Sequence, residues 1–453
     1  MRRAICKPWR CLYSICILKL IPRFSACLLL GLATTLPFGA MGQSNNLGSI
    51  GNTPLSELGL GELMPDGSTR EQAMGEAGAA APSREHISLL NPANLWYNRQ
   101  VNLEVGLRTS IRHGRSGAGS VTAARFTPMH FTMTLPIAEP VTLALGLRQF
   151  SAIDYTVSAA RPLAADTNVS FRNSFGGRGA ISQAMVAASV RLAEGLTLGA
   201  QGLYWFGTQQ RYSEVELNTL GLARSTSSRV SDVSARVGAT YRLQLPGGKR
   251  IGLGLVADLP RQLRTQDEIV LDRYSINALS GTRTFLSSDT LLRMQNGLLQ
   301  APRSLRAGLS FEQPQRYTVA VDLVRELWAG VVPLGTPGNL QDAWRGSAGV
   351  EWVPNVNGQG YRNYISYRAG LYGRQLPFSV NGTRMQDIGL TLGLGWPVIR
   401  KEARYTRPVV NTNLNLGLRQ GPTEAGSFRE AYVNFTLGIV LNDSQWFTRF
   451  KID

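Results

Sequence analysis

Alternation of apolar and small or polar residues at every second position is the feature that most constrains the fold of this chain. One side of residues 430–441 carries Ala431, Val433, Phe435, Leu437, Ile439 and Leu441, and the other carries Tyr432, Asn434, Thr436 and Gly438. A period of two places these sets on opposite faces of a β-strand. The pattern therefore predicts a strand with one apolar face and one face of small or polar side chains.

Fourteen segments share this alternation. They are residues 101–110, 128–135, 141–150, 181–192, 195–206, 231–244, 250–259, 302–312, 316–326, 344–353, 363–373, 387–396, 408–418 and 430–441. Their lengths suit a tilted strand that crosses a bilayer, which needs roughly 9–11 residues. After the first 42 residues no run of apolar residues is long enough for a membrane-spanning helix.

The connections between these segments alternate between short and long. Links rich in turn-forming residues follow the second, fourth, sixth and eighth segments, whereas residues 151–180, 207–230 and 260–301 are long. Short periplasmic turns and long extracellular loops are typical of outer-membrane barrels. We therefore predict an all-β fold in which residues 99–453 form a 14-stranded antiparallel transmembrane β-barrel. A soluble β-sandwich or propeller is the alternative, but it has no need for so many glycine and polar positions opposite its apolar face.

The first 42 residues are predicted to be a secretory signal peptide. Residues 1–23 contain six basic and no acidic residues, residues 26–36 are apolar, and Ala40 and Gly42 precede a cleavage point before Gln43. All four cysteines lie at or before Cys27, so no disulfide and no cysteine-bound metal is expected in the exported chain. Removal of this segment leaves 41 basic and 30 acidic residues, a net charge of +11. An exported protein of this charge is expected to face anionic lipid and lipopolysaccharide, not nucleic acid.

Residues 43–98 differ from the rest of the chain. They are rich in glycine, alanine and polar residues and lack the alternation of the strands. A free tail has this kind of composition. The more informative interpretation is a hatch that plugs the lumen of the barrel.

Two stretches of this region resemble the N-terminal hatch of FadL-like outer-membrane transport proteins. They are Ser68-Thr69-Arg70-Glu71-Gln72-Ala73-Met74-Gly75-Glu76-Ala77-Gly78-Ala79 and Asn91-Pro92-Ala93-Asn94-Leu95. Residues 301–308, 350–355 and 367–370 are similar to later strands of that family, but Glu76 stands where the family commonly has glycine. The resemblance implies a monomeric, plugged barrel in the bacterial outer membrane. It also implies that hydrophobic molecules, such as long-chain fatty acids, reach a lumenal pocket and leave through an opening in the wall.

Several residues are candidates for a functional role. The predicted hatch residues are Gly75, Gly78, Asn91, Pro92 and Ala93. Asparagine bonds to nearby backbone and proline restricts φ, so Asn91-Pro92-Ala93 is expected to stiffen a turn that holds the hatch, the alternative being an ordinary loop before the first strand.

Two further candidates are predicted to line a ligand site. Trp205 is a candidate for an apolar pocket, with anchoring at the membrane interface as the alternative. Arg306 is a lumenal cation able to hold a carboxylate. In the long connection 260–301, Ser288-Asp289 followed by leucines predicts a short amphipathic helix.

No catalytic, metal or cofactor site is predicted. His86, His113 and His130 are the only histidines, and none has a partner at metal-ligand spacing. The predicted function is passive uptake of hydrophobic small molecules. The alternative within the same family is a secretion shuttle that binds exported proteins at the cell surface, and an outer-membrane enzyme is a third class.

Overall fold

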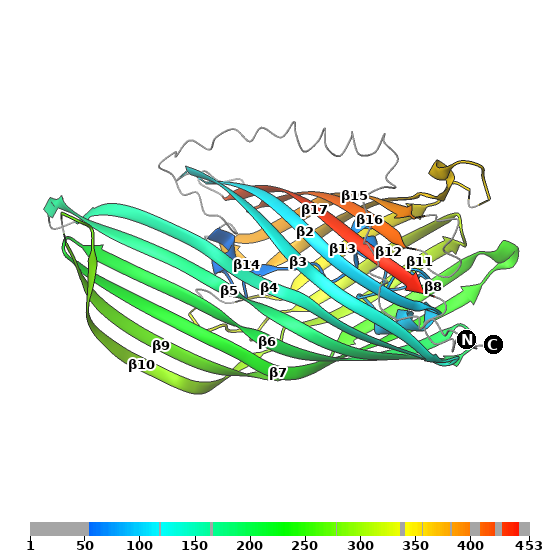
Figure 1. Ribbon diagram of the computed structural model, residues 1–453, viewed down its shortest axis with the longest axis horizontal. Coiled ribbons are helices and arrows are strands. Elements are labelled where there is room, and N and C mark those ends of the chain that lie inside the picture. The colour runs from blue at the N-terminus through cyan, green and yellow to red at the C-terminus, as the bar shows by residue number, and fades with distance from the viewer. Residues whose placement is uncertain are drawn as a thin grey trace, which may run out of the picture. The chain divides into compact units, whose positions relative to one another are not determined.

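The computed structural model describes residues 54–116, 119–163, 166–277, 279–335, 340–355, 357–380, 383–398, 408–421 and 428–443. Within these ranges, fourteen antiparallel strands form a closed ring (Figure 1). They are β2 (Val101–Ser116), β3 (Gly119–Ala138), β4 (Val141–Leu163), β5 (Asp166–Ala193), β6 (Leu196–Leu217), β7 (Leu220–Gln244), β8 (Arg250–Asp258), β11 (Arg303–Gln313), β12 (Tyr317–Leu327), β13 (Ala343–Trp352), β14 (Ser366–Val380), β15 (Thr383–Pro397), β16 (Val409–Gln420) and β17 (Arg429–Asp443). The ring closes because β17 pairs with β2, from Asp443 opposite Val101 to Arg429 opposite Arg115. The predicted 14-stranded barrel is confirmed.

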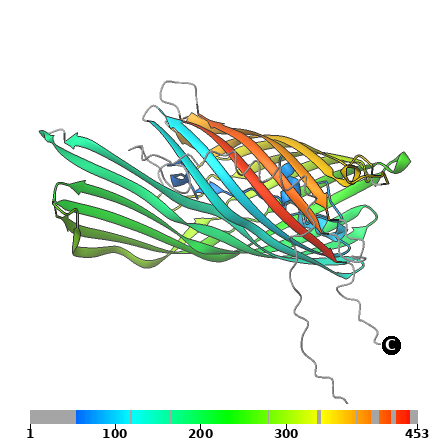
Figure 2. The same ribbon diagram turned by 45° about the horizontal axis from the view of Figure 1, so that its top comes forward.

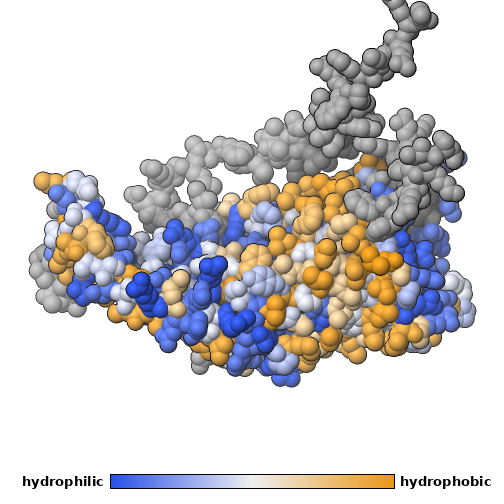
Figure 3. Space-filling model, turned by 60° about the horizontal axis from the view of Figure 1, so that its bottom comes forward, coloured by the Kyte–Doolittle hydropathy of each residue, from blue (hydrophilic) through white to orange (hydrophobic). Residues whose placement is uncertain are grey.

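The two faces of each strand meet opposite environments. On β17, Val433 and Phe435 point outward and are about two-fifths exposed, whereas Asn434 and Thr436 point into the barrel and are 1% exposed. Figure 3 shows apolar residues spread over the outer surface of the wall. An apolar outside around a polar inside fits a barrel in lipid, where the sheet must close to satisfy its backbone groups. It excludes the soluble β-sandwich.

Strands replace the long connections that the sequence predicts. Residues 151–163 and 166–180 continue β4 and β5, and residues 207–230 continue β6 and β7. The strands β9 (Gln262–Ile276) and β10 (Arg283–Gln300) form a hairpin, and β9 pairs with residues 220–230 of β7. These elements form a sheet that extends past the end of the barrel (Figures 1 and 2).

The predicted amphipathic helix in residues 288–299 is wrong, because these residues belong to β10. A short isolated helix gains little from its own hydrogen bonds. The extended edge of β7 instead offers a row of N–H and C=O groups to β9. Once β9 pairs there, it offers the same kind of edge to β10.

Strands β3 and β4 are unpaired with each other over their far halves. These strands pair only from His130 opposite Arg148 to Ala138 opposite Val141. Farther from the short turns, β3 pairs with β2 and β4 pairs with β5. The pairing of β2 with β3 shifts beside Pro128, which has no N–H to donate, and β4 shifts after Gln149. Figure 2 shows the resulting gap between these two strands.

Residues 54–98, which we call the hatch, lie against the inner wall. They contain η1 (Pro54–Glu57), β1 (Glu62–Leu63), α2 (Thr69–Ala73) and η2 (Pro92–Tyr97). Strand β1 pairs with Ala152 and Ser151 of β4, beside the gap. Two further single turns are η3 (Pro246–Gly248) and η4 (Tyr361–Tyr364). Among the described residues, no helix has the length and apolar character needed to span a membrane. The predicted signal peptide and residues 43–53 lie outside the described residues.

Candidate functional site

Glycines of the inner wall let the hatch touch the strand backbones. A Cβ atom added to any of them would meet residues 69–93 of the hatch at close range. They are Gly199, Gly238, Gly252, Gly254, Gly308, Gly349, Gly370, Gly393 and Gly438, from eight strands. The hatch therefore packs against positions of the wall that carry no side chain. Close contact with the hatch is the physical reason for glycine at these nine positions.

Gly75 and Gly78 anchor the first half of the hatch. Gly75 has a φ of +69° and lies against the backbone of Leu371, and its N–H donates to the Thr391 hydroxyl at 3.0 Å. The N–H of Gly78 donates to the Asp322 carboxylate at 3.1 Å. Both predicted hatch glycines thus lie where the hatch meets the wall.

Glu76 shows how this chain departs from the family pattern. Its φ is +64°, a region that favours glycine. Its carboxylate accepts a 2.7 Å bond from Arg345 of β13. This ion pair stabilises a backbone conformation that a glycine adopts without strain.

The Asn91-Pro92-Ala93 turn anchors the second half of the hatch. The Asn91 side chain accepts a bond from the Ala93 N–H at 3.0 Å and donates to the Ala79 carbonyl at 2.8 Å and to the Thr240 hydroxyl at 2.9 Å. Pro92 is the first residue of η2. The Ala93 carbonyl accepts a bond from the Ser189 hydroxyl. The turn connects two parts of the hatch to β5 and β7.

Glu71 holds the hatch together from within. Its carboxylate accepts bonds from the Ser68 N–H at 2.8 Å, the Ser88 hydroxyl at 2.6 Å and the Leu89 N–H at 3.2 Å. Burial raises the pKa of Glu71, although these hydrogen bonds oppose the rise. Residues 68–71 and 88–89 are therefore joined through one side chain.

Glu62 forms an ionic contact between the hatch and two strands of the wall. Arg112 of β2 lies 2.7 Å from its carboxylate, and Arg419 of β16 also lies 2.7 Å away. The same arginines bind Glu430, and Arg419 also binds Asp387. Burial acts to raise the pKa of Glu62, but the two guanidinium groups outweigh it and hold that pKa well below its usual range. The carboxylate is charged and links the hatch to β2 and β16, which lie on either side of β17.

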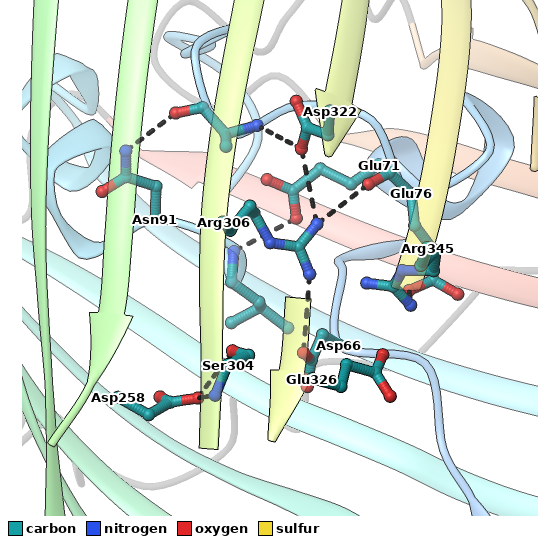
Figure 4. Close-up of polar contacts among 12 residues, drawn as sticks. Asp66, Glu71, Glu76, Asn91, Asp258, Ser304, Arg306, Asp322, Glu326 and Arg345 are labelled. Carbon is teal, nitrogen blue, oxygen red and sulfur yellow. Dashed lines mark hydrogen bonds and ion pairs between the residues drawn. The ribbon is translucent and has the colours of Figure 1, made fainter. Parts of the chain in front are cut away.

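Asp66 forms another ionic contact between the hatch and the wall (Figure 4). Its carboxylate lies 2.7 Å from Arg148, 3.6 Å from Arg306 and 4.0 Å from Arg236. Burial acts to raise its pKa, but these arginines and Arg345 lower it far below the usual range. One aspartate thus neutralises cations from four strands, and no sequence pattern singled it out.

Arg306, a predicted ligand-lining residue, lies in the centre of this cluster. Figure 4 shows its guanidinium between Asp322, Glu76 and Asp66. It donates to the Glu76 carbonyl at 3.2 Å and to the Asp322 carboxylate at 3.4 Å. Its present partners are groups of the protein, so a ligand carboxylate would compete with Asp66 and Asp322 for it.

Trp205, the other predicted ligand-lining residue, faces a small lumenal pocket. Its ring packs edge-on against Phe150 with centroids 4.7 Å apart, and its Nε1 donates to the Ser234 hydroxyl at 2.7 Å. The pocket has a volume of about 70 Å³. Its apolar lining includes Leu63, Phe150, Leu203, Trp205 and Trp328, and its charged lining includes Asp66, Arg148, Arg236 and Arg345. The pocket lies beside the gap, because Arg148 and Phe150 lie where β4 departs from β3.

His86 is a buried imidazole of the hatch. Its Nε2 lies 3.2 Å from the Asn411 side chain and its Nδ1 lies 3.3 Å from Ser83. Burial, with repulsion from Arg368 and Arg70, lowers its pKa to about 3.

We expect His86 to weaken the folded protein as the pH falls. The unfolded chain binds a proton below about pH 6.5, whereas the folded one stays neutral until about pH 3. Stability from this group is therefore complete above pH 6.5 and decreases by about 2 kcal/mol at pH 5. Thermal unfolding at pH 7 and pH 5 should show a smaller shift for His86→Gln than for the wild type. Equal shifts would exclude this role.

Comparisons with known proteins agree with the geometry. A family model described as BamG matches residues 27–453. The search of curated proteins gives no match.

Three solved structures share the fold. A Pseudomonas aeruginosa FadL homologue is 10% identical, with 84% of this chain and 99% of that chain covered and a TM-score of 0.59. The P. putida toluene transporter TodX is 15% identical, with 84% and 99% covered and a TM-score of 0.53. The CymD monoaromatic hydrocarbon channel is 17% identical, with 84% and 98% covered and a TM-score of 0.53. The chain therefore belongs to the BamG family, as a bacterial outer-membrane protein with the FadL-like barrel that its sequence predicts.

Proposed function

We propose that this protein is an outer-membrane channel for passive uptake of hydrophobic small molecules, with long-chain fatty acids as the substrate class. The observation that carries the proposal is the gap between β3 and β4 beside the Trp205 pocket. Hatch residues 69–93 lie against the glycine wall, which supports a plug across the direct route to the periplasm. The separation of β3 and β4 beside the pocket supports a sideways route toward the lipid instead.

The lining of the pocket suits an amphipathic molecule. Trp205 and Phe150 supply apolar surface, and Arg148 and Arg236 supply positive charge for a carboxylate. The pocket volume of about 70 Å³ is close to that of two water molecules in the liquid. Passage of a fatty acid therefore requires residues 62–66 to move, and the anchors at Gly75, Gly78 and Asn91–Ala93 would hold the rest of the hatch in place.

A disulfide between β1 and β4 tests this movement. Leu63 and Ser151 are opposite each other in the sheet, and the predicted exported chain has no cysteine of its own. The Leu63→Cys/Ser151→Cys protein, oxidised and placed in liposomes, is expected to take up a fluorescent long-chain fatty acid no faster than empty liposomes. Reduction should restore uptake.

A pair in the outer wall provides the control. Leu309 and Val321 are opposite each other on β11 and β12 and both point outward. The Leu309→Cys/Val321→Cys protein should transport equally in both redox states. Equal uptake by the oxidised and reduced hatch pair would contradict the required movement, and uptake at the level of empty liposomes by the wild type would contradict transport itself.

The secretion-shuttle alternative has one structural observation in its favour. The extended hairpin β9–β10 exposes Phe285, Leu291 and Met294, each about three-fifths accessible. Such apolar side chains beyond the barrel suit a protein surface. Recovery of exported proteins with this chain from native membranes, together with no fatty-acid uptake by the purified protein, would favour the shuttle.

A further inference from the structure

A second, larger cavity lies on the opposite side of the hatch from the gap. Its volume is about 1120 Å³. Its walls include residues 194–195 between β5 and β6 and residues 313–316 between β11 and β12, and hatch residues 82–86 and 96–97 border it from above. Short turns mark the periplasmic end of an outer-membrane barrel. We call this cavity the periplasmic vestibule.

The vestibule is strongly cationic. Its lining includes Arg70, Arg84, Arg99, Arg191, Arg242, Arg250 and Arg316, against Glu85, Glu194, Glu312 and Glu351. Glu351 is held by Arg70 at 2.5 Å, and Glu312 by Arg242 and Arg250. The lining therefore has more arginines than carboxylates, and two of these carboxylates are already paired with arginines of the lining.

Arg84, Arg99 and Arg191 form the centre of the excess charge. Among the described residues, none of the three forms an ion pair within 4.0 Å. Burial lowers the pKa of Arg99, and so do the charges of Arg191 and Arg84, although the Glu139 carboxylate opposes them. These guanidinium groups therefore lie close enough to repel one another.

Aromatic rings hold the cations in place. The Arg99 guanidinium lies 3.7 Å from the centre of the Trp96 ring, and that of Arg191 lies 5.3 Å from it. Arg242 lies 4.9 Å from the centre of the Tyr97 ring. The Glu139 carbonyl accepts bonds from Arg99 at 2.6 Å and from Trp96 at 3.1 Å. Stacked guanidinium groups are restrained but keep edge N–H donors free for an anion.

We propose that the periplasmic vestibule binds an acidic, extended peptide segment of a periplasmic protein. Clusters of arginine recognise acidic motifs by charge-assisted hydrogen bonds, and Trp96 and Tyr97 add apolar contact for the peptide between its charges. A single small anion would occupy only part of 1120 Å³. A lipid headgroup would have to leave its leaflet to enter a cavity that is lined by the hatch and the turns.

Binding of a labelled peptide to the purified full-length protein tests the proposal. The probe is a fluorescein-labelled peptide of alternating glutamate and serine, and its fluorescence anisotropy in detergent is titrated at low and high salt. Saturable binding that weakens with salt is expected. The Arg84→Gln/Arg99→Gln/Arg191→Gln protein should bind about tenfold more weakly or worse.

A matched variant controls for net charge. Arg224, Arg229 and Arg293 are exposed on the extended sheet at the far end, and the Arg224→Gln/Arg229→Gln/Arg293→Gln protein loses the same charge. It should bind the peptide like the wild type. Equal loss in both variants, or no loss in either, would overturn the proposal.

Two competitors distinguish the sources of negative charge. Displacement of the peptide by inorganic phosphate at equal concentration would show a small-anion site, and displacement by anionic phospholipid vesicles would show a lipid site; either overturns the assignment. Arg84, Arg99 and Arg191 are exposed, so folding should survive their substitution, and an unchanged thermal midpoint checks this. Fatty-acid uptake by the same variants should be unchanged, which separates this result from the transport proposal.

Discussion

The Gly349→Val protein is expected to expose its hatch to trypsin, whereas the wild type protects it. A Cβ at Gly349 of β13 would press on the backbone and side chain of Met74. The backbone of a paired strand has little freedom to move, so the hatch must shift away from the wall. Overpacking of this kind costs typically about 1–3 kcal/mol. Cleavage at Arg70, which is 4% exposed, reports the displacement, and a lowered thermal midpoint reports the lost stability.

The same strand supplies the control. Gly346 of β13 points outward, and nothing lies within 4 Å of a Cβ added there. Gly346→Val should retain the cleavage pattern and the thermal midpoint of the wild type. If both variants behave alike, the effect belongs to the strand and not to contact with the hatch.

The Glu62→Gln protein is expected to lose the attachment of β1 to β4. The substitution keeps the shape of the side chain but leaves Arg112 and Arg419 without this buried charge. Removal of one partner from a buried ion pair costs about 3–5 kcal/mol. Detachment should widen the route from the Trp205 pocket to the gap, so liposomes should take up fatty acid faster and trypsin should reach the hatch.

A series of pH values and a variant of a second carboxylate are the controls for this prediction. Because the folded pKa of Glu62 is lowered, its stabilising contribution is complete above the usual glutamate pKa and is lost as the pH falls through the lowered value. The difference between wild type and variant should therefore stay constant from pH 6 to pH 8. Glu268→Gln, on β9 and outside the ion pairs of the hatch, should change neither uptake nor cleavage. Unchanged uptake and cleavage in Glu62→Gln would show that Glu62 does not attach β1 to the wall.

The strands of the ring follow from local pattern, and the extended sheet does not. Each of the fourteen ring strands overlaps one of the segments predicted from alternation. Residues 283–300 were not predicted to be a strand, because β10 is exposed on both faces and needs no regular alternation. Its conformation comes from the edge of β9, a contact that no local pattern records.

In the candidate site too, some residues were predicted from the sequence and others were not. Gly75, Gly78 and Asn91 were marked by the resemblance, and each makes the contacts of an anchoring residue. Glu62 and Asp66 were missed, because an acidic residue in an irregular segment gives no signal until its partners are known. Arg419, the partner of Glu62, is 357 positions away in the chain.

The sequence by itself determined the alternation and the absence of cysteine after residue 27, and from the alternation a closed barrel in an outer membrane. These properties are local: each depends on a residue and its near neighbours, and lipid outside with water inside selects the same alternation in every strand. Only the tertiary structure decided that glycines of eight strands face one hatch, that β3 and β4 part beside Trp205, and that arginines gather beneath the hatch. These features depend on distances between residues far apart in the chain, which are set when the sheet closes around the hatch.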